Sequence, residues 1–294
     1  MKSAYSQSSS NVSKTWILII LFTALVTGIC YAAGLYFNMP WLAFIGLLLA
    51  LGQGFVGYQF GDKIALSSVG AKQVKSEDSP QLYEMVQNLS KIAGIPTPKI
   101  YISPDESANA FACGRDPEHA SICFNQGIIS LLDRNEIEGV TAHELAHIKN
   151  RDILVMTVVS VLAGVIAFIA DIGGRLAFFG GGNSDSDSKN PFGMILFIAL
   201  LIFAPFVGLL IQMGVSRSRE FLADATAVTM TRYPEGLVHA LEKLYASPVP
   251  SSHYSSATSH FFIAPPKQTF GQKVSGLFST HPPIEQRVAA LKQM

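Results

Sequence analysis

Residues 15–60 read TWILIILFTALVTGICYAAGLYFNMPWLAFIGLLLALGQGFVGYQF, and they contain no Asp, Glu, Lys, Arg or His. One membrane crossing by a helix takes about 20 consecutive apolar residues, so this stretch is long enough to cross twice. Asn38, Met39 and Pro40 interrupt it, because proline beside a small polar residue commonly ends a helix. The stretch therefore predicts a transmembrane hairpin with spans near residues 16–33 and 41–58.

Two other interpretations of this stretch have to be weighed. Either run could be a buried helix of a large soluble protein. Lys2, the first apolar run and Tyr31-Ala32-Ala33 are also similar to a cleavable signal peptide. The second run follows the first with no charged stretch between them, however, and this favours a retained hairpin.

Two further apolar runs occur later in the chain, at residues 153–170 and 191–216. Neither carries an ionisable side chain, and Pro205 predicts a kink in the second. An ionisable side chain in the middle of a bilayer costs about 2.5–3.5 kcal/mol on insertion scales, so its absence is what a span requires. We therefore expect four transmembrane helices, although the first of these two runs is short and could also be a buried helix.

Basic residues near the ends of the four runs predict the orientation, because Lys and Arg accumulate on the cytoplasmic side of a membrane. With four crossings, every basic cluster falls on one side, so that side is the cytoplasm and both termini lie there. The connecting loop at residues 171–190 holds Arg175 and Lys189 against three Asp. The clusters are Lys2 and Lys14, then Lys63, Lys72 and Lys75, then Lys149 and Arg151, and finally Arg217 and Arg219.

The composition agrees with a membrane protein. Of 294 residues, 49% are hydrophobic and 14% are charged, whereas about 25% are charged in a typical globular chain. The formal net charge is zero, so no general attraction to nucleic acid is expected. An odd number of cysteines, Cys30, Cys113 and Cys123, predicts reduced thiols rather than a disulfide framework. The absence of a CxxC motif argues against a cysteine-based zinc site.

The polar blocks at residues 61–152 and 217–294 lie on the same predicted side and are expected to form one domain, interrupted by the last two spans at 153–216. Residues 1–60 form the tail and the hairpin. The first block predicts a helix over residues 80–93 and strands over 99–103 and 120–125. Asp133 with Glu136 is typical of a capped helix start. No Pro follows before residue 170, so we expect this helix to run directly into the third span.

The sequence HELAH at residues 143–147 carries the most specific chemical signal. On a helix, residues four apart lie on one face, about 5–6 Å from each other, so His143 and His147 can hold one metal ion. Glu144 follows the first histidine, which suits a base that acts on water activated by the metal. The alternative is a chance HExxH in a helix that binds no metal.

A zinc site needs a third protein ligand and an open position for water. No third histidine follows at the short spacing of the extended motif. Glu220, in the sequence REFLAD directly after the fourth run, is the best candidate. Asp224 lies one turn further on the same face and could hold a ligand histidine by its second nitrogen. The alternative is a surface helix with ordinary charges.

With these motifs in place, the chain resembles the HtpX family of membrane metalloproteases, which is related to the CAAX prenyl proteases. HELAH at 143–147 and EFLAD at 220–224 carry the resemblance. NAFACG at 109–114 and THPP at 280–283 with Arg287 extend it. The match runs in order from about residue 61 to the end. Cys113 stands where a small residue such as Thr is expected.

The resemblance implies that His143, His147 and Glu220 bind one Zn²⁺ and that Glu144 is the catalytic base. It implies a mainly α integral membrane protein whose cytoplasmic α+β domain is a zincin-like metalloprotease, located in the bacterial inner membrane. It also implies cleavage of misfolded or membrane proteins in quality control and the stress response. The partners would be the lipid bilayer and these protein substrates, without nucleic acid.

Several alternatives stay open at this point. The chain could be a catalytically silent membrane scaffold that keeps the metal for folding, whereas a transporter lacks support because no span carries a charge in its middle. Residues 109–112 could present an edge strand to an extended peptide, or they could form a turn. His281 could lie near the site or simply precede the last helix.

Overall fold

The computed structural model describes residues 4–36, 38–162, 217–247, 263 and 282–294. The predicted fourth span, the last part of the third from residue 163 onward, the loop between them and His281 lie outside these residues.

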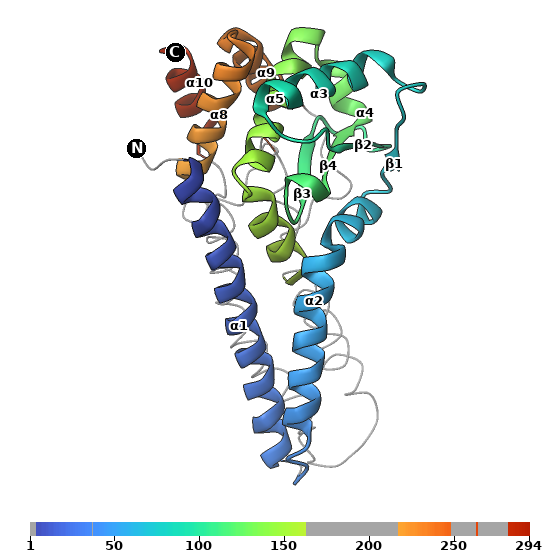
Figure 1. Cartoon of the computed structure of the whole chain (residues 1–294), viewed down its shortest axis with the longest axis vertical. Coiled ribbons are helices and arrows are strands. Elements are labelled where there is room, and N and C mark those ends of the chain that lie inside the picture. The colour runs from blue at the N-terminus through green and yellow to red at the C-terminus, as the bar shows by residue number, and fades with distance from the viewer. Residues whose placement is uncertain (1–3, 37, 163–216, 248–262, 264–281) are drawn as a thin grey trace, which may run out of the picture.

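Two long helices form the stalk of the molecule in Figure 1, α1 (Ala4–Tyr36) and α2 (Leu42–Ser68). They are antiparallel and joined by a tight turn, as the break at residues 38–40 predicts. Asn38 adopts a positive φ of 52° in this turn. The backbone N–H of Met39 donates to the carbonyl of Gly34 over 2.7 Å, and a Cβ on Gly34 would lie 2.7 Å from the Met39 oxygen. The turn therefore requires glycine at this position.

The outer faces of α1 and α2 are apolar and exposed. A contiguous apolar surface of this extent is unfavourable in contact with water. Within the described residues, Ser10–Gly28 and Leu42–Ser68 are long and apolar enough to cross a membrane. Only 33% and 22% of their most apolar windows are buried inside the protein. Ile20, Phe44 and Leu49 are each more than 60% exposed. These helices therefore do not resemble the buried core helices of a soluble protein.

A shorter apolar helix, Asp152–Leu162, lies between α1 and α2 where the stalk meets the body (Figure 1). Its side chains Leu154, Val158 and Leu162 form one buried cluster with residues of α1. Glycines of α2 permit close packing: a Cβ on Gly61 would lie 2.6 Å from Thr157 Cγ2, and one on Gly54 would lie 2.9 Å from Ile19 Cγ2 on α1. Small residues at helix contacts are the usual way for helices to associate in lipid.

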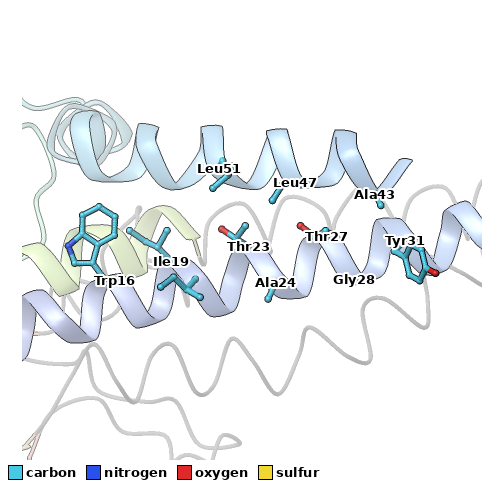
Figure 2. A pocket seen from close by; sticks show the side chains of 11 residues that line it. Trp16, Ile19, Thr23, Ala24, Thr27, Gly28, Tyr31, Ala43, Leu47 and Leu51 are labelled. Carbon is cyan, nitrogen blue, oxygen red and sulfur yellow. The ribbon is translucent and has the colours of Figure 1, made fainter. Parts of the chain in front are cut away.

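An apolar hollow of about 640 Å³ lies along the contact between α1 and α2. Figure 2 shows Trp16, Thr23 and Tyr31 of α1 and Leu47 and Leu51 of α2 around it. The hydroxyl oxygens of Thr23 and Thr27 are buried and have no hydrogen-bond partner among the described residues.

The body contains a four-stranded sheet with the order β1-β2-β4-β3. Strands β2 and β4 are parallel, and the other two pairs are antiparallel. Strand β3 lies at one edge of the sheet. Of the two interpretations of residues 109–112, the edge strand is therefore confirmed and the turn is wrong. The strands are β1 (Lys72–Gln73), β2 (Lys99–Ser103), β3 (Ala110–Gly114) and β4 (Ala120–Asn125), with the 3-10 helix η1 (Pro117–His119) before β4.

Among the described residues, six helices that Figure 1 labels complete the body, and they share one hydrophobic core. Helix α3 begins with Pro80 and ends at Ala93, and Gly94 caps its C-terminus with a φ of 71°. The core joins Leu89 and Leu145 of the first polar block with Leu241 and Leu291 of the second, so both blocks fold against each other. The helices are α3 (Pro80–Ala93), α4 (Gln126–Leu131), α5 (Arg134–Lys149), α8 (Arg217–Thr231), α9 (Pro234–Ala246) and α10 (Ile284–Leu291).

Helix α5 does not continue into the third apolar run, so this expectation is wrong. The helix ends at Lys149, Asn150 caps it, and Arg151 adopts a left-handed conformation with φ 56°. A new helix starts at Asp152. No Pro or Gly marks the break, because a single residue other than glycine can adopt this conformation at a modest cost.

The glycine contacts generate a test of the stalk. Gly54→Leu and Gly61→Leu should each lower the stability of the protein in detergent by about 1–3 kcal/mol, because side chains inserted into a packed contact force the helices apart. The measurement is the thermal unfolding midpoint. Gly52→Leu is the matched control, since no described atom lies within 4 Å of a Cβ at that position. An equal loss at all three positions would contradict the packing described.

Candidate metal centre

Helix α5 places the two motif histidines in the interior of the body. Its start is fixed by a capping box, in which Asp133 accepts the backbone N–H of Glu136 and the Glu136 side chain accepts that of Asp133. His143 and His147 then lie one turn apart and are 1% and 4% exposed. Buried imidazoles at this depth need polar partners, because burial without hydrogen bonds is costly.

The two imidazoles point toward one another. The two Nε2 atoms are 3.1 Å apart, and the rings meet edge to face with centroids 4.7 Å apart. Glu220 completes the group, with Oε2 at 3.6 Å from His143 Nε2 and Oε1 at 3.6 Å from His147 Nε2. Within the described part of the chain, these three residues form a cluster whose potential ligand atoms all lie within 4.8 Å of one another.

Helix α8 brings Glu220 to this position from a distant part of the sequence. It lies beside α5 in Figure 1, and small side chains allow the close approach. Ala142 and Ala146 on α5 and Ala223 and Ala227 on α8 are all buried in the shared core. Small residues let two helix backbones approach, so a carboxylate on one helix can reach side chains on the other.

The cluster fits one tetrahedral metal ion. Zn–N distances of about 2.0–2.1 Å in tetrahedral geometry separate neighbouring ligand atoms by about 3.3 Å. The observed separations of 3.1, 3.6 and 3.6 Å lie on both sides of this value. The second nitrogen of each imidazole faces a carboxylate, which favours a proton there and leaves both Nε2 atoms as electron-pair donors aimed at the same point. A cation between them removes the repulsion between those donors.

Asp224 holds His143 from the side opposite the cluster. Its Oδ1 lies 2.9 Å from His143 Nδ1, the arrangement expected from its position one turn after Glu220. Arg287 of α10 donates two hydrogen bonds to the Asp224 carboxylate, at 2.7 and 2.8 Å. Its Nη1 also lies 3.3 Å from Glu220 Oε2. One fully buried guanidinium therefore fixes two carboxylates of the centre.

His147 is held by Asp152, a residue that the sequence reading did not single out. Asp152 Oδ2 lies 3.1 Å from His147 Nδ1. This contact depends on the break after α5, because the left-handed Arg151 turns the chain so that Asp152 faces back toward the helix. In the sequence, Asp152 is visible only as an Asp five residues after the second histidine. Its contact with His147 could not be predicted, because the break in the helix that produces it is marked by no Pro or Gly.

The electrostatic field at the cluster attracts positive charge. Burial alone would lower the pKa of His143, but its hydrogen bonds to Asp224 and Glu220 outweigh this and raise the pKa to about 9. Burial also raises the pKa of Asp224, yet Arg287 and His143 reverse the effect and keep it below its ordinary value. A site that stabilises a proton on a neutral ligand in this way also stabilises a divalent cation in its place.

Glu144 lies beside the cluster and is 4% exposed. Burial raises the pKa of its carboxyl group, against the opposing effect of His143 and His147. The carboxylate accepts a hydrogen bond from the backbone N–H of Ala112 in β3. The base candidate therefore joins the metal-binding helix to the outer edge of β3, where it occupies the N–H of Ala112.

Further residues of the site came to light only in the structure. Asn109 Oδ1 accepts the backbone N–H of Ile263 over 3.1 Å, and Arg287 donates to the Ile263 carbonyl over 3.0 Å. Asn109 and Arg287 belong to segments that carried the family resemblance, but no local pattern indicated their contacts with Ile263. Cys113 and Cys123 are buried free thiols, as expected for reduced cysteines.

An HExxH helix, a distant glutamate on a neighbouring helix and a buried base together define the centre of a metallopeptidase. Comparison with known proteins agrees with this class. The model of peptidase family M48 matches residues 76–294. A protease HtpX homolog of Caldanaerobacter subterraneus subsp. tengcongensis is 42% identical over 299 residues, covering 100% of this chain and 98% of the relative. A second protease HtpX homolog, from Syntrophobacter fumaroxidans, is 42% identical over 283 residues, covering 96% of this chain and 98% of the relative.

The solved structure of S. mikatae Ste24p shares the fold. Its TM-score is 0.52 at 18% sequence identity, and the match covers 98% of this chain and 67% of that one. The chain therefore belongs to peptidase family M48 and, within it, to the HtpX proteases. It is a membrane-bound metallopeptidase with a metal cofactor, and the resemblance seen in its motifs is confirmed.

The raised pKa of His143 predicts that metal binding depends on pH. In the metal-free protein His143 binds a proton up to a pH of about 9, so an ion that uses the same nitrogen must displace that proton at lower pH. Apparent affinity should therefore rise about tenfold per pH unit between pH 7 and 9 and level off above this range. The measurement is competition with a chromogenic chelator at constant ionic strength.

A matched control for this titration is His119→Ala. His119 is exposed and bonded to Asp116 in the turn before β4, so its loss should leave the slope unchanged. An affinity that stays constant between pH 7 and 9 in the unsubstituted protein would contradict the account of His143.

Proposed function

We propose that the protein is a zinc endopeptidase of the bacterial inner membrane that hydrolyses peptide bonds in misfolded or membrane proteins. His143, His147 and Glu220 would hold the zinc ion, and Glu144 would be the catalytic base. The observation that carries the proposal is the convergence of two Nε2 atoms and one carboxylate within 4.8 Å. Two imidazoles and one carboxylate with an open fourth position are a set typical of catalytic zinc.

Each residue of the centre has a separate role in the proposed hydrolysis. When bound, zinc supplies Lewis-acid activation of water and polarises the scissile carbonyl. Glu144, whose pKa is raised by burial, takes the proton of the attacking water and passes it to the leaving amine. Asp224 and Asp152 keep the two imidazoles oriented through their second nitrogens. Arg287 holds Asp224 in place and partly neutralises the carboxylates around the ion.

An extended polypeptide is the substrate form that the sheet favours. Strand β3 pairs with β4 on one side only, so it is an edge of the described sheet. On its other side, the N–H of Ala112 donates to Glu144 and that of Gly114 donates to Thr157 Oγ1 at 3.0 Å. Because these two N–H groups are already engaged, a peptide added as a further strand beside β3 would bond to other backbone groups of the strand, and it would pass close to the base. Unfolded segments provide such a strand, whereas folded proteins do not.

The membrane arrangement is proposed as four crossings with the body and both termini in the cytoplasm. Two apolar helices of the stalk support the first pair, and the charge-free runs at residues 153–170 and 191–216 support the second. The basic residues flanking the runs support the orientation. In this arrangement the metal centre lies close to the inner surface of the membrane, within reach of cytoplasmic and membrane-inserted substrates.

The test of the proposed function is removal of the base. Glu144→Ala and the isosteric Glu144→Gln should lower the rate of casein cleavage by a factor of about 10²–10⁴, because the proton transfers lose their carrier. Both variants should retain zinc, since Glu144 is not among the proposed ligands. The measurements are turnover of labelled casein and zinc content of the purified full-length protein.

Glu138→Ala is the matched control, because Glu138 lies on the same helix and is not buried. It should cleave at the rate of the unsubstituted protein. Chelation should abolish cleavage, and added zinc should restore it. Undiminished cleavage by Glu144→Ala would refute the assigned role, and a loss of zinc in Glu144→Gln would show that Glu144 holds the ion instead.

A further inference from the structure

A buried amide on the membrane helix α1 contacts the turn that follows the metal-binding helix. Asn11 is 1% exposed. Its Nδ2 donates to the carbonyl of Asn150 over 3.0 Å and to Asp152 Oδ1 over 2.8 Å. An amide nitrogen has two hydrogens to donate, so both are used in these two bonds. A buried polar group with both donors satisfied is a specific contact rather than a chance neighbour.

The two acceptors flank the break between α5 and the next helix. Arg151, with its positive φ of 56°, stands between them in the chain. A residue other than glycine adopts this conformation only where its surroundings maintain it. The Asn11 amide bonds to both sides of the break, so it joins the end of α5 to the start of the following helix and stabilises the reversal between them.

The same bond fixes the carboxylate that holds His147. One oxygen of Asp152 accepts from Asn11 and lies 3.4 Å from Arg219 Nε, and the other lies 3.1 Å from His147 Nδ1. Asp152 is fully buried. With both of its oxygens engaged, the carboxylate has one orientation, and this orientation directs Nε2 of His147 toward His143 and Glu220.

The other imidazole is held by a parallel arrangement. His143 is held by Asp224, and Asp224 is held by Arg287 from the C-terminal helix α10. His147 is held by Asp152, and Asp152 is held by Asn11 from the N-terminal helix α1. Each imidazole is therefore oriented by a carboxylate, and each carboxylate is oriented by a donor from one end of the chain.

We propose that Asn11 is a positioning residue for His147, acting through Asp152, so that the first membrane helix completes the metal centre. The inference rests on the proposed function for the identity of the ion and the three ligands. It adds a dependence of the centre on the membrane anchor: α1 does more than hold the peptidase at the bilayer, because one of its side chains fixes the orientation of a ligand.

The experiment compares zinc affinity in full-length variants purified in detergent. Asn11→Leu removes the amide at similar volume, and Asn11→Asp replaces the donor with a carboxylate facing Asp152. Partners of ligand residues typically change metal affinity 10–100-fold, so we expect a loss of this size for Asn11→Leu and a larger one for Asn11→Asp. The measurements are chelator competition with zinc and the visible absorption of the cobalt-substituted protein, which reports ligand geometry.

Thr15→Val is the matched control on the same face of α1. Thr15 is also fully buried, and its hydroxyl donates to the carbonyl of Asn11 over 3.0 Å. Valine keeps the volume and removes the hydroxyl, so zinc affinity should stay within twofold of the unsubstituted protein and the cobalt spectrum should not change. The thermal midpoint of each metal-free variant shows whether it is folded.

A double-mutant cycle separates positioning from general destabilisation. In an Asp152→Ala background, Asn11→Leu should cause little further loss of zinc affinity, because the residue through which it acts is gone. An equal loss in both backgrounds, or an affinity for Asn11→Leu within twofold of the unsubstituted protein, would overturn the inference. If the unsubstituted protein binds no zinc, the proposed function and this inference both fail. If the unsubstituted protein binds zinc tightly and the Asn11 variants bind it equally well, this inference alone fails.

Discussion

The convergence of two imidazoles and one carboxylate in a buried, electron-rich space is the constraint on which the rest of the structure depends. Such a group is unfavourable without a cation, because three electron-pair donors face one another away from water. The negative field of Glu220 and Asp224 is strong enough to raise the pKa of His143 to about 9 despite its burial. The neighbouring arginines balance the charge of the carboxylates: Arg219 Nε lies 3.4 Å from Asp152 Oδ1, and Arg287 Nη1 lies 3.3 Å from Glu220 Oε2.

Several separate elements hold that group together. The capping box starts α5 at a defined residue, alanines let α8 approach it, and the break at Arg151 turns Asp152 back toward His147. The N-terminal and C-terminal helices then each supply one donor, Asn11 and Arg287. The centre is thus assembled from four separate stretches of the chain, and its geometry depends on the contact between the membrane stalk and the body.

Much of this could be predicted from local patterns. The charge-free stretch predicted the hairpin, and the Asp133–Glu136 pair predicted where α5 begins, because capping is read from a few adjacent residues. The HExxH spacing and the later glutamate indicated which side chains meet, since helical periodicity fixes one pair and the fold brings in the third. These patterns are short-range, and the structure agrees with them.

The remaining features depend on interactions that no local pattern records. The break after α5 relies on a left-handed arginine, and arginine shows no preference for that conformation, so the prediction of one continuous helix was wrong. Asp152, Asn11 and Ile263 meet the site through contacts between residues far apart in sequence. Arg287 was named only as part of the family resemblance, and its complete burial beside two carboxylates supplies the physical reason for an arginine there.

The most direct test of the central claim is an anomalous difference map at the zinc edge from crystals of the full-length protein. We predict one peak bonded to His143 Nε2, His147 Nε2 and a carboxylate oxygen of Glu220, at distances of about 2.0–2.2 Å. A peak elsewhere in the protein, or a Glu220 carboxylate well outside bonding distance of the ion, would contradict the account.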